Sequence, residues 1–354
     1  MTRVALDLLG GDRAPECVVD GALLVDDPDV EIVLVGPVGL AERLLAERGA
    51  VGRFRMVAAS QVVEMDEDPA RAVRVKRDAT VRVAARLVRD GEADAMVSVG
   101  STGAALAAAV FTLGRLRGVS RPALAAIIPA KAGPLVFLDA GAGTEATPAL
   151  LAQFALAGAA LATVRLGIAA PRVGLLNVGE EPGKGDELRR EAHAALSALP
   201  VVFVGNVEGR DVPYGGRADV VVTDGFTGNV LAKGLEGAAT MLTEVVQEAL
   251  TSTPERAAAS AELLVALETA TSHMGPEQLG GAVLLGVKGV VVVGHGASTP
   301  VGVASCVRVA VQAARDGLVP RIAAALSDLQ DRTRAAAAAA AADHPAPAPE
   351  LETT

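Results

Sequence analysis

Short apolar runs of strand length alternate with alanine-rich segments of helical length along most of this chain. The nine runs occupy residues 4–9, 31–36, 55–59, 95–100, 135–141, 173–179, 201–205, 220–225 and 287–294. Runs as continuously apolar as Gly-Val-Val-Val-Val-Gly at residues 289–294 suit strands that are buried on both faces, as in parallel sheets. Strands that alternate with helices in this way indicate βαβ units. The pattern therefore predicts a three-layered α/β fold around a mostly parallel sheet.

The composition disfavours several classes of function. A net charge of −10 argues against nucleic acid as a partner, because phosphate binding needs a basic face. An aromatic content of 2% also leaves little on which bases could stack. Cys17 and Cys306 are the only cysteines and the four histidines are scattered, so we expect neither a disulfide framework nor a metal site.

The sequence also bears on membranes. The amino-terminal residues reach Asp7 before any apolar stretch of signal-peptide length has formed. The longest weakly interrupted apolar stretch, residues 148–164, contains Gln153, which favours a buried helix over a membrane span. We therefore expect a soluble, cytoplasmic protein.

Two segments depart from the alternation. Residues 228–272 contain no run of strand length, and Pro254 within them suits the first turn of a new helix, so we expect a helical hairpin that packs on a neighbour or a twin subunit. Alanines at 335–342 extend a final helix, which the following prolines stop. We expect one α/β domain over residues 1–330, containing the hairpin, and an alanine- and proline-rich disordered tail over residues 331–354.

In α/β sheets, ligands bind beyond the carboxyl ends of the strands. The turns at those ends are rich in glycine, small polar residues and acids, and they comprise residues 7–15, 98–103, 139–143, 177–185, 205–211, 224–229 and 294–298. Glycine lets the backbone approach a ligand closely, and a helix N-terminus beyond it offers free N–H groups to an anion. Each segment alone is compatible with an ordinary tight turn. Seven of them on one sheet edge predict an anion-binding cleft.

No familiar catalytic motif accompanies these turns. The chain lacks the Walker pattern, a complete dinucleotide fingerprint, the Gly-x-Ser-x-Gly elbow and His-Glu-x-x-His. Lysine is rare among the 32 basic residues, which draws attention to sites that would need a compact ammonium group. These lysines are Lys76, Lys131, Lys184, Lys233 and Lys288. Their survival by chance is the alternative interpretation.

Residues 71–89 carry arginines on one side of an expected amphipathic helix. At 100° per residue, these arginines fall within about a third of a turn, opposite the apolar side chains. They are Arg71, Arg74, Arg82, Arg86 and Arg89. A solvated face paired with nearby acids is one interpretation, and a docking surface for an acidic protein is the other.

The turn sequences, in their order, resemble the phosphate acyltransferase family of bacterial phospholipid synthesis (the PlsX family) over residues 6–314. The most specific matches are Asn177-Val178-Gly179-Glu180-Glu181 with Lys184-Gly185, Gly205-Asn206-Val207-Glu208-Gly209-Arg210-Asp211, Asp224-Gly225-Phe226-Thr227-Gly228-Asn229, and Gly280-Gly281 with Lys288 and His295-Gly296. The chain departs from the family at Leu8-Leu9, where Ala-Met is usual, and at Ser101 and Gly143, where asparagine is common. The resemblance implies a Rossmann-like α/β/α sandwich, similar to isocitrate dehydrogenase and phosphotransacetylase, that forms a homodimer.

The resemblance further implies transfer of a fatty acyl group from acyl-[acyl carrier protein] to inorganic phosphate, without a cofactor. The product would be an acyl phosphate for phospholipid synthesis. A phosphate oxygen would attack the thioester and expel the carrier thiol, so the protein would orient the substrates and stabilise an oxyanion rather than supply a nucleophile. The implied partners are acyl carrier protein, a second copy of the chain and a membrane glycerol-3-phosphate acyltransferase, the last placing the protein at the inner membrane face.

The matching positions carry the implied roles. Lys184, Lys233, Asn229 and His295 would be catalytic, with the lysines on phosphate or the oxyanion and His295 protonating the leaving thiolate. The substrate-binding set is Asp7, Gly10, Gly11, Asp12, Ser101, Thr102, Asn177, Glu180, Asn206, Glu208, Asp224 and Lys288. Within it the asparagines would act as neutral donors, and the acids would orient the lysines and hold the turns. The arginines of residues 71–89 would dock the acidic carrier.

Two other functions stay open from the sequence. A coenzyme-A-dependent phosphate acetyl- or butyryltransferase shares the implied fold and chemistry. A non-catalytic scaffold for lipid-synthesis enzymes would be favoured if the changes at Ser101 and Gly143 have emptied the site. Phosphate-dependent turnover separates the scaffold from both enzymes, and the choice of thioester separates the enzymes from each other.

Overall fold

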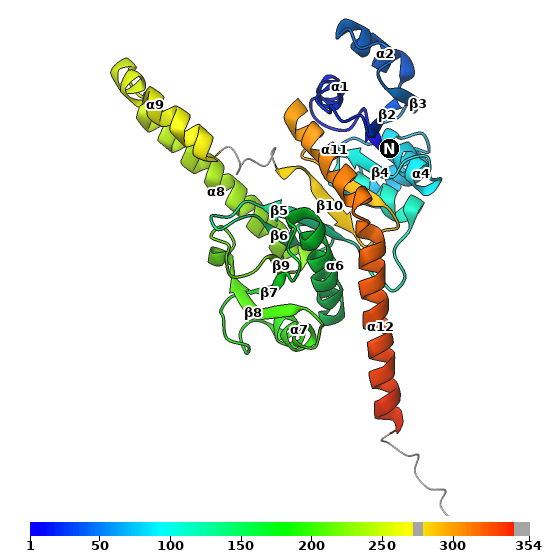
Figure 1. The fold of residues 1–354 in the computed structure, drawn as a ribbon, viewed down its shortest axis with the longest axis vertical. Coiled ribbons are helices and arrows are strands. Elements are labelled where there is room, and N and C mark those ends of the chain that lie inside the picture. Colours follow the sequence, from blue (N-terminus) through cyan, green and yellow to red (C-terminus); the bar gives the residue numbers. More distant parts are fainter. Residues whose placement is uncertain (272–278, 343–354) are drawn as a thin grey trace, which may run out of the picture.

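The computed structural model, which describes residues 1–271 and 279–342, contains one sheet of eleven strands with helices on both faces (Figure 1). The strands are β1 (Thr2–Asp7), β2 (Val30–Gly36), β3 (Arg55–Ala58), β4 (Ala95–Ser98), β5 (Ala123–Ile128), β6 (Leu135–Leu138), β7 (Arg172–Asn177), β8 (Val202–Glu208), β9 (Val220–Val222), β10 (Ala282–Leu285) and β11 (Val290–Val293). Their order across the sheet is β3-β2-β1-β4-β11-β10-β5-β6-β9-β7-β8. Each predicted run overlaps a strand, and the α/β class is confirmed.

Helices close both faces of the sheet. They are α1 (Glu16–Leu23), α2 (Val38–Glu47), α3 (Pro69–Val75), α4 (Thr80–Arg89), α5 (Thr102–Ala108), α6 (Pro148–Leu166), α7 (Glu187–Ser197), α8 (Gly225–Thr251), α9 (Pro254–Thr271), α11 (Pro300–Arg315) and α12 (Leu318–Ala342), with a π-helical turn η1 (Ala109–Leu113) and a 3₁₀ turn η2 (Gly209–Asp211). Successive side chains of a strand point to opposite faces. Accordingly, Leu6 of β1 belongs to the core cluster that includes residues of α1, α6 and α11, whereas Ala5 belongs to the cluster that includes residues of α3, α4 and α5. The result is the expected three layers.

Strands β5 and β10, which the sequence pattern did not reveal, reverse the direction of the sheet. β10 is antiparallel to both β11 and β5, and β5 is antiparallel to β6. The strands β3, β2, β1, β4 and β11 form one parallel half, and β6, β9, β7 and β8 form a second parallel half of opposite direction. The expectation that all seven turns share one sheet edge is therefore wrong.

The twist of the sheet partly offsets this reversal. Neighbouring strands rotate by roughly 20–25° relative to each other. Five steps separate β4 from β9, so the rotation accumulates to roughly 100–125°. The carboxyl ends of the second half are thereby turned back toward those of the first, and the turns form two clusters rather than one row.

The expected single helix over residues 71–89 is also wrong, because the chain forms α3 and α4 with a break at residues 76–79. Contacts with the preceding loop hold this break open. Lys76 Nζ donates to the Val62 carbonyl at 2.8 Å, and the Asp78 carboxylate accepts from the Ser60 hydroxyl at 2.6 Å. The five arginines therefore do not form one continuous stripe.

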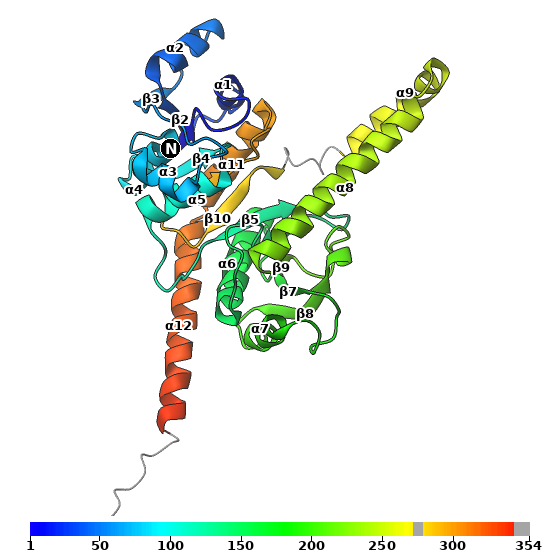
Figure 2. The ribbon, with the colours of Figure 1, turned by 180° about the vertical axis from the view of Figure 1, so that it is seen from behind.

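The helical hairpin of the sequence analysis is present as α8 and α9, which project from the body as an arm (Figures 1 and 2). Thr253 caps the start of α9, because its hydroxyl accepts from the Arg256 N–H at 3.2 Å. The last residue of the predicted hairpin, 272, lies outside the described residues. At the other end, α12 continues to Ala342, so residues 331–342 of the predicted tail are helical, and residues 343–354 lie outside the described part.

Within the described part of the chain, one helix, α6, is long and apolar enough to cross a membrane. More than half of that stretch is buried inside the fold. Leu151, Ala155 and Leu161 belong to the main core, so the prediction of a buried helix is confirmed.

Candidate active site

The first cluster of predicted residues lies at the carboxyl ends of β1 and β4. Asp7 is buried, and its carboxylate accepts from the Ser98 hydroxyl at 2.7 Å. Burial raises the pKa of Asp7, and hydrogen bonds from Thr80 and Ser98 offset only part of this effect. Gly10 passes so close that an added Cβ would lie 2.6 Å from the Asp7 carboxylate, which explains why glycine is needed there. Ser98 was not among the predicted site residues.

One further predicted segment, the turn at residues 294–298, joins the turns after β1 and β4 in this cluster. The Asp12 N–H donates to the Gly296 carbonyl at 2.8 Å, which places the first turn against the turn that carries His295. His295 is exposed, and its Nδ1 accepts from the Ala297 N–H at 3.1 Å. The neutral ring therefore carries its proton on Nε2. Ser101 caps α5 by accepting from the Ala104 N–H at 3.3 Å, and Thr102 follows as the first helical residue.

The second cluster centres on the loop that carries Lys184, which follows β7. Asn177 donates its amide to the Lys184 carbonyl at 3.0 Å, and Asn206 donates to the Glu181 carbonyl at 2.7 Å. Both asparagines are buried. The predicted neutral donors thus hold the loop itself. The exposed Lys184 ammonium has no ion pair among the residues that the structure describes.

The acids of this cluster pair with arginines, so the expectation that they orient lysines is wrong. Glu180 lies 2.5 Å from Arg217, which lowers the pKa of the Glu180 carboxyl, and Glu208 lies 2.7 Å from Arg210. Among the described residues, the one lysine that forms an ion pair is Lys76, with Glu67. Arginine is the common cation of this chain, and its planar fork suits a carboxylate.

The start of α8 completes the second cluster. Asp224 caps this helix through the Thr227 N–H at 2.9 Å and pairs with Arg189. Burial raises the pKa of Asp224, but the two hydrogen bonds from Thr227 and the Arg189 cation together bring it below its ordinary value. Asn229 donates to the Ala140 carbonyl at 3.1 Å, and Lys233 lies exposed one turn further along the same face.

Two residues of the second cluster were not predicted. Asp139 accepts four backbone N–H groups, from Leu124, Gly141, Ala142 and Gly143, and so fixes the turn beneath Asn229. Its position directly after an apolar run was a signal for this role. Arg189, inside α7, ties Asp186 to Asp224, and nothing in the sequence distinguishes it from the other helical arginines.

Lys288 does not join either cluster. It lies between β10 and β11, at the opposite end of β11 from His295, and its N–H donates to the Gly114 carbonyl at 2.9 Å. The short strand β11 thus separates the two residues, which lie at its opposite ends.

The predicted docking arginines have separate structural environments. Arg82 donates to the Val73 and Arg74 carbonyls at 2.7 and 3.1 Å and so caps the carboxyl end of α3. The Arg74 guanidinium lies 4.4 Å from the centre of the Phe111 ring, and Arg89 pairs with Asp90. Arg71 is exposed and Arg86 is half-buried. The latter two remain the most available for a partner.

The arrangement suits chemistry on an anion. Both clusters contain a helix N-terminus and glycine turns, and the second also carries the exposed ammonium groups of Lys184 and Lys233. Such groups attract phosphate or stabilise an oxyanion. Within residues 1–271 and 279–342, no group of three histidine, cysteine or acidic side chains could hold a metal ion.

The fold is that of the phosphotransacylase enzymes. A phosphotransacetylase from Streptococcus pyogenes superposes with a TM-score of 0.61 at 16% identity, covering 89% of this chain and 94% of that one. A branched-chain phosphotransacylase from Enterococcus faecalis gives 0.55 at 17% identity, covering 89% and 99%. The predicted Rossmann-like sandwich related to phosphotransacetylase is therefore confirmed.

The family follows from the sequence comparisons. Residues 2–321 match the family model described as "Fatty acid synthesis protein". A relative from Desulfitobacterium hafniense, named phosphate acyltransferase, is 43% identical over 91% of this chain and 96% of its own length. Another of that name, from Heliobacterium modesticaldum, is 45% identical over 90% and 96%. The chain belongs to this family of acyltransferases, as the resemblance predicted.

Proposed function

We propose that the protein transfers a fatty acyl group from the thioester of acyl carrier protein to inorganic phosphate, giving an acyl phosphate for phospholipid synthesis. The observation that carries the proposal is the near-full-length similarity to relatives named phosphate acyltransferase. The site supports it chemically, because exposed lysines and helix N-termini attract a phosphate ion, and no cysteine lies in either cluster to act as a covalent nucleophile.

Both reacting groups are competent near pH 7. Phosphate is largely a dianion if its second pKa resembles the value of about 6 for a phosphorylated side chain. The leaving thiol has an ordinary pKa of about 8.5. A phosphate oxygen forms the new bond to the carbonyl carbon, and the carbon–sulfur bond breaks. The proton that phosphate loses balances the proton that sulfur gains, so the protein has only to orient the groups and stabilise the oxyanion.

Roles for individual residues follow from their environments. Lys184 contributes a free ammonium on a loop that two buried asparagines hold, so it can contact phosphate without first breaking an ion pair. His295 has its Nδ1 occupied by the Ala297 N–H, which leaves a proton on Nε2 of the neutral ring, and its proposed role is to donate that proton to the thiolate. Lys233 and Asn229 lie on one face of α8 above the Asp139 turn and contribute to phosphate binding.

A turnover assay tests the proposal. Purified protein with palmitoyl-[acyl carrier protein] should release free carrier thiol only when phosphate is present, and acyl phosphate should form in equal amount. Stronger phosphate-dependent turnover of acetyl- or butyryl-coenzyme A would assign the protein to the coenzyme-A-dependent enzymes instead. No phosphate-dependent turnover of any thioester would leave the scaffold role.

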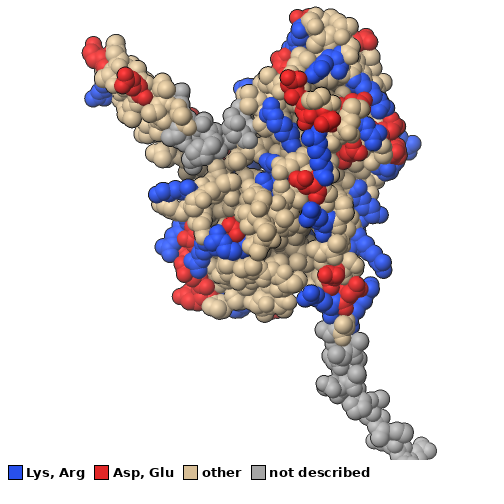
Figure 3. Space-filling model, viewed as in Figure 1, with Lys and Arg blue, Asp and Glu red and all other residues tan. Residues whose placement is uncertain are grey.

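The proposed partners extend beyond the substrates. We propose a homodimer, because the α8–α9 arm exposes apolar side chains and presents mainly uncharged surface between its base and its tip (Figure 3). We also propose a cytoplasmic location, with a membrane glycerol-3-phosphate acyltransferase as the consumer of the product at the inner membrane face. An acyl phosphate is an activated, short-lived acyl donor, which favours proximity between the two enzymes.

A further inference from the structure

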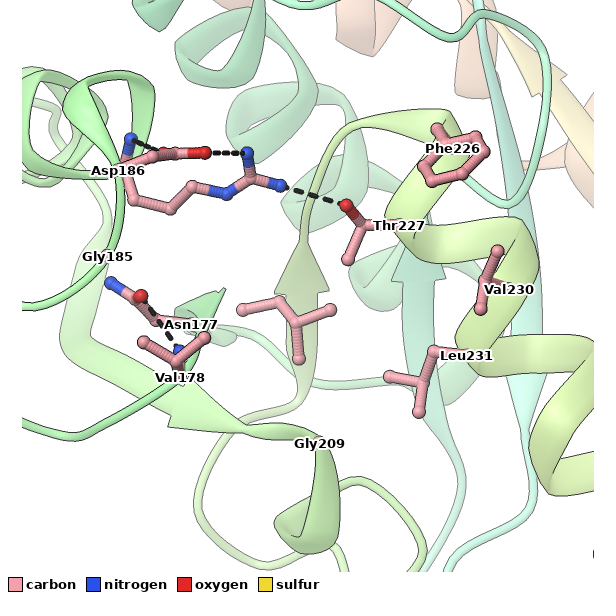
Figure 4. Close-up of a pocket in the computed structure, with 11 residues that line it drawn as sticks. Asn177, Val178, Gly185, Asp186, Gly209, Phe226, Thr227, Val230 and Leu231 are labelled. Atoms are coloured by element: carbon pink, nitrogen blue, oxygen red, sulfur yellow. Dashed lines mark hydrogen bonds and ion pairs between the residues drawn. The ribbon is translucent and has the colours of Figure 1, made fainter.

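An apolar pocket of about 480 Å³ lies beside the Lys184 loop, between the carboxyl ends of β7 and β8 and the first turns of α8. We call it the Phe226 pocket. Figure 4 shows Phe226, Val230 and Leu231 on the α8 side, with Val178 across the pocket from them. Leu176 of β7 is buried beneath, with 5% of its surface exposed. The pocket therefore has an apolar floor and two apolar walls.

The walls of the pocket expose three large apolar side chains. Phe226 is 63% exposed, Val230 is 60% exposed and Val178 is 81% exposed. Burying such surface contributes roughly 25 cal/mol per Å², so three large apolar side chains gathered at one pocket are a binding surface. Phe226 and Val230 are four residues apart on one helix face, which aligns them along the pocket.

The polar rim of the pocket argues against a second phosphate as the occupant. Among the described residues, the one cationic side chain that lines the pocket is Arg189, and two carboxylates, Asp186 and Asp224, already pair with it. The lining therefore offers an anion no unpaired cation, and the neighbouring carboxylates repel an anion. An uncharged, flexible apolar chain meets no such penalty.

The pocket is continuous with the candidate active site. Gly185 lines it directly after Lys184, and Asn177, which lines it too, donates to the Lys184 carbonyl at 3.0 Å. A chain lying along Phe226 and Val230 would therefore present its first carbons to the Lys184 loop. This continuity favours the acyl substrate over a separate ligand.

We infer that the Phe226 pocket binds the acyl chain of the thioester substrate and that Val230 and Phe226 set the preference for chain length. The inference rests on the proposed function, because it needs a substrate with an acyl chain. Long chains gain contact with the pocket walls, and short chains leave them uncovered.

The test compares Val230→Trp with Val51→Trp, a control at another exposed valine, in a loop outside both clusters. Palmitoyl and butyryl thioesters of the same carrier are the substrates, and kcat/KM is measured for each. Filling the pocket should lower the palmitoyl-to-butyryl ratio by about 10-fold or more, since one methylene in an apolar pocket is worth about 10–200-fold. Val51→Trp should leave the ratio unchanged.

Phe226→Ala provides an independent variant, because an exposed side chain can be truncated without opening the core. It should raise KM for the palmitoyl thioester by a larger factor than KM for the butyryl thioester, because the longer chain loses more contact. Equal losses on both thioesters, or no loss on either, in variants of an active protein would overturn the pocket assignment alone.

Two other outcomes have different meanings. A wild-type protein that turns over neither thioester with phosphate would overturn the proposed function, and the acyl-chain assignment with it. A change in molar mass of Val230→Trp by light scattering, with an unaltered chain preference, would make the pocket an interface between two copies of the chain and so reject the inference.

Discussion

Lys184 carries a charge that no neighbouring acid neutralises in the described structure, and its loop is fixed through backbone carbonyls. This arrangement leaves the ammonium group available to an incoming phosphate. Lys184→Ala should therefore raise the KM for phosphate or lower kcat by about 10²-fold, the scale of one lost oxyanion donor. Steady-state kinetics with varied phosphate measure the effect. Lys131→Ala, at another exposed lysine outside both clusters, should behave as wild type. Wild-type kinetics in folded Lys184→Ala would remove this residue from the site.

Asp7 should make the protein less stable as the pH rises. Its folded pKa lies above the ordinary value of 3.8 because burial disfavours the charged form. As the pH rises above about 4, the Asp7 carboxyl therefore loses its proton in the unfolded chain before it does so in the folded protein. The free energy of unfolding then decreases with pH, until the pH has passed the folded pKa. Asp7→Asn removes the charge, so its Tm should exceed that of wild type at pH 7, and the difference should shrink toward pH 4.

Melting curves of both proteins at several pH values check this sign. A variant that is less stable than wild type at pH 7, but equal to it at pH 4, would mean that the folded state prefers the ionised carboxylate. Each unit of pKa corresponds to about 1.4 kcal/mol, so even a modest shift is measurable.

At the residue scale, the sequence identified the turns but not their partners. Glycines and acids after apolar runs marked the turns that begin at Asp7, Asn177 and Asp224, and in the structure these residues lie at or just after the ends of β1, β7 and β9. Which arginine pairs with each acid depends on the tertiary structure. The sequence alone therefore could not identify Arg189 as the partner of Asp224 or Arg217 as the partner of Glu180. Asn177 and Asn206 likewise bind loop carbonyls that only the folded chain brings within reach.

At the element scale, the predictable parts were those with long, continuous patterns. β10 has four residues and β5 begins Ala-Leu-Ala-Ala, a composition with weak strand preference, and neither was recognised. The break between α3 and α4 contains neither proline nor glycine. Bonds from Lys76 and Asp78 to the preceding loop produce it, and helical periodicity does not record such contacts.

The break changes which arginines are suited to bind the acidic carrier. Arg82 caps α3, so the double variant Arg71→Glu with Arg86→Glu is the sharper test. It should slow association with acyl carrier protein, because rim charges act mainly on the association rate. The effect should fade at 1 M salt, where the Debye length is about 3 Å. Stopped-flow binding at two salt concentrations measures both.

Two controls accompany this experiment. Arg43→Glu with Arg53→Glu changes the net charge equally at another exposed part of the surface and should leave association unaffected. The Arg71→Glu, Arg86→Glu double variant should turn over a short acyl-pantetheine, which lacks the carrier, at the wild-type rate. Equal losses on both substrates would show a structural effect, and unchanged association would place carrier docking elsewhere.

At the scale of the whole molecule, the α8–α9 arm should be covered by a second copy of the chain. Met241, Leu242 and Val245 are each more than half exposed, as is Leu263 of α9. Light scattering should give a mass near twice 35.6 kDa. Leu242→Glu should shift the protein toward monomer, whereas Glu244→Gln on the same helix should not. A monomeric wild type at micromolar concentration would reject the arm as a dimer interface.

β11 comes late in the sequence but lies beside β4 in the first parallel half of the sheet. This half can therefore be completed only after β11 has been synthesised. β4 pairs with β11, with Ser98 opposite Val293, so this side of β4 stays unpaired until Val293 has been synthesised. The second half needs only residues between β6 and β9, and its contacts are closer in sequence. Contacts between residues that are close in sequence form earlier than contacts between distant ones.

In pulsed hydrogen exchange during refolding, amides of β7 should therefore become protected before those of β4. On the ribosome, β4 stays an open edge for on the order of ten seconds or more at 5–20 residues per second, a period in which an unpaired strand can recruit the wrong partner.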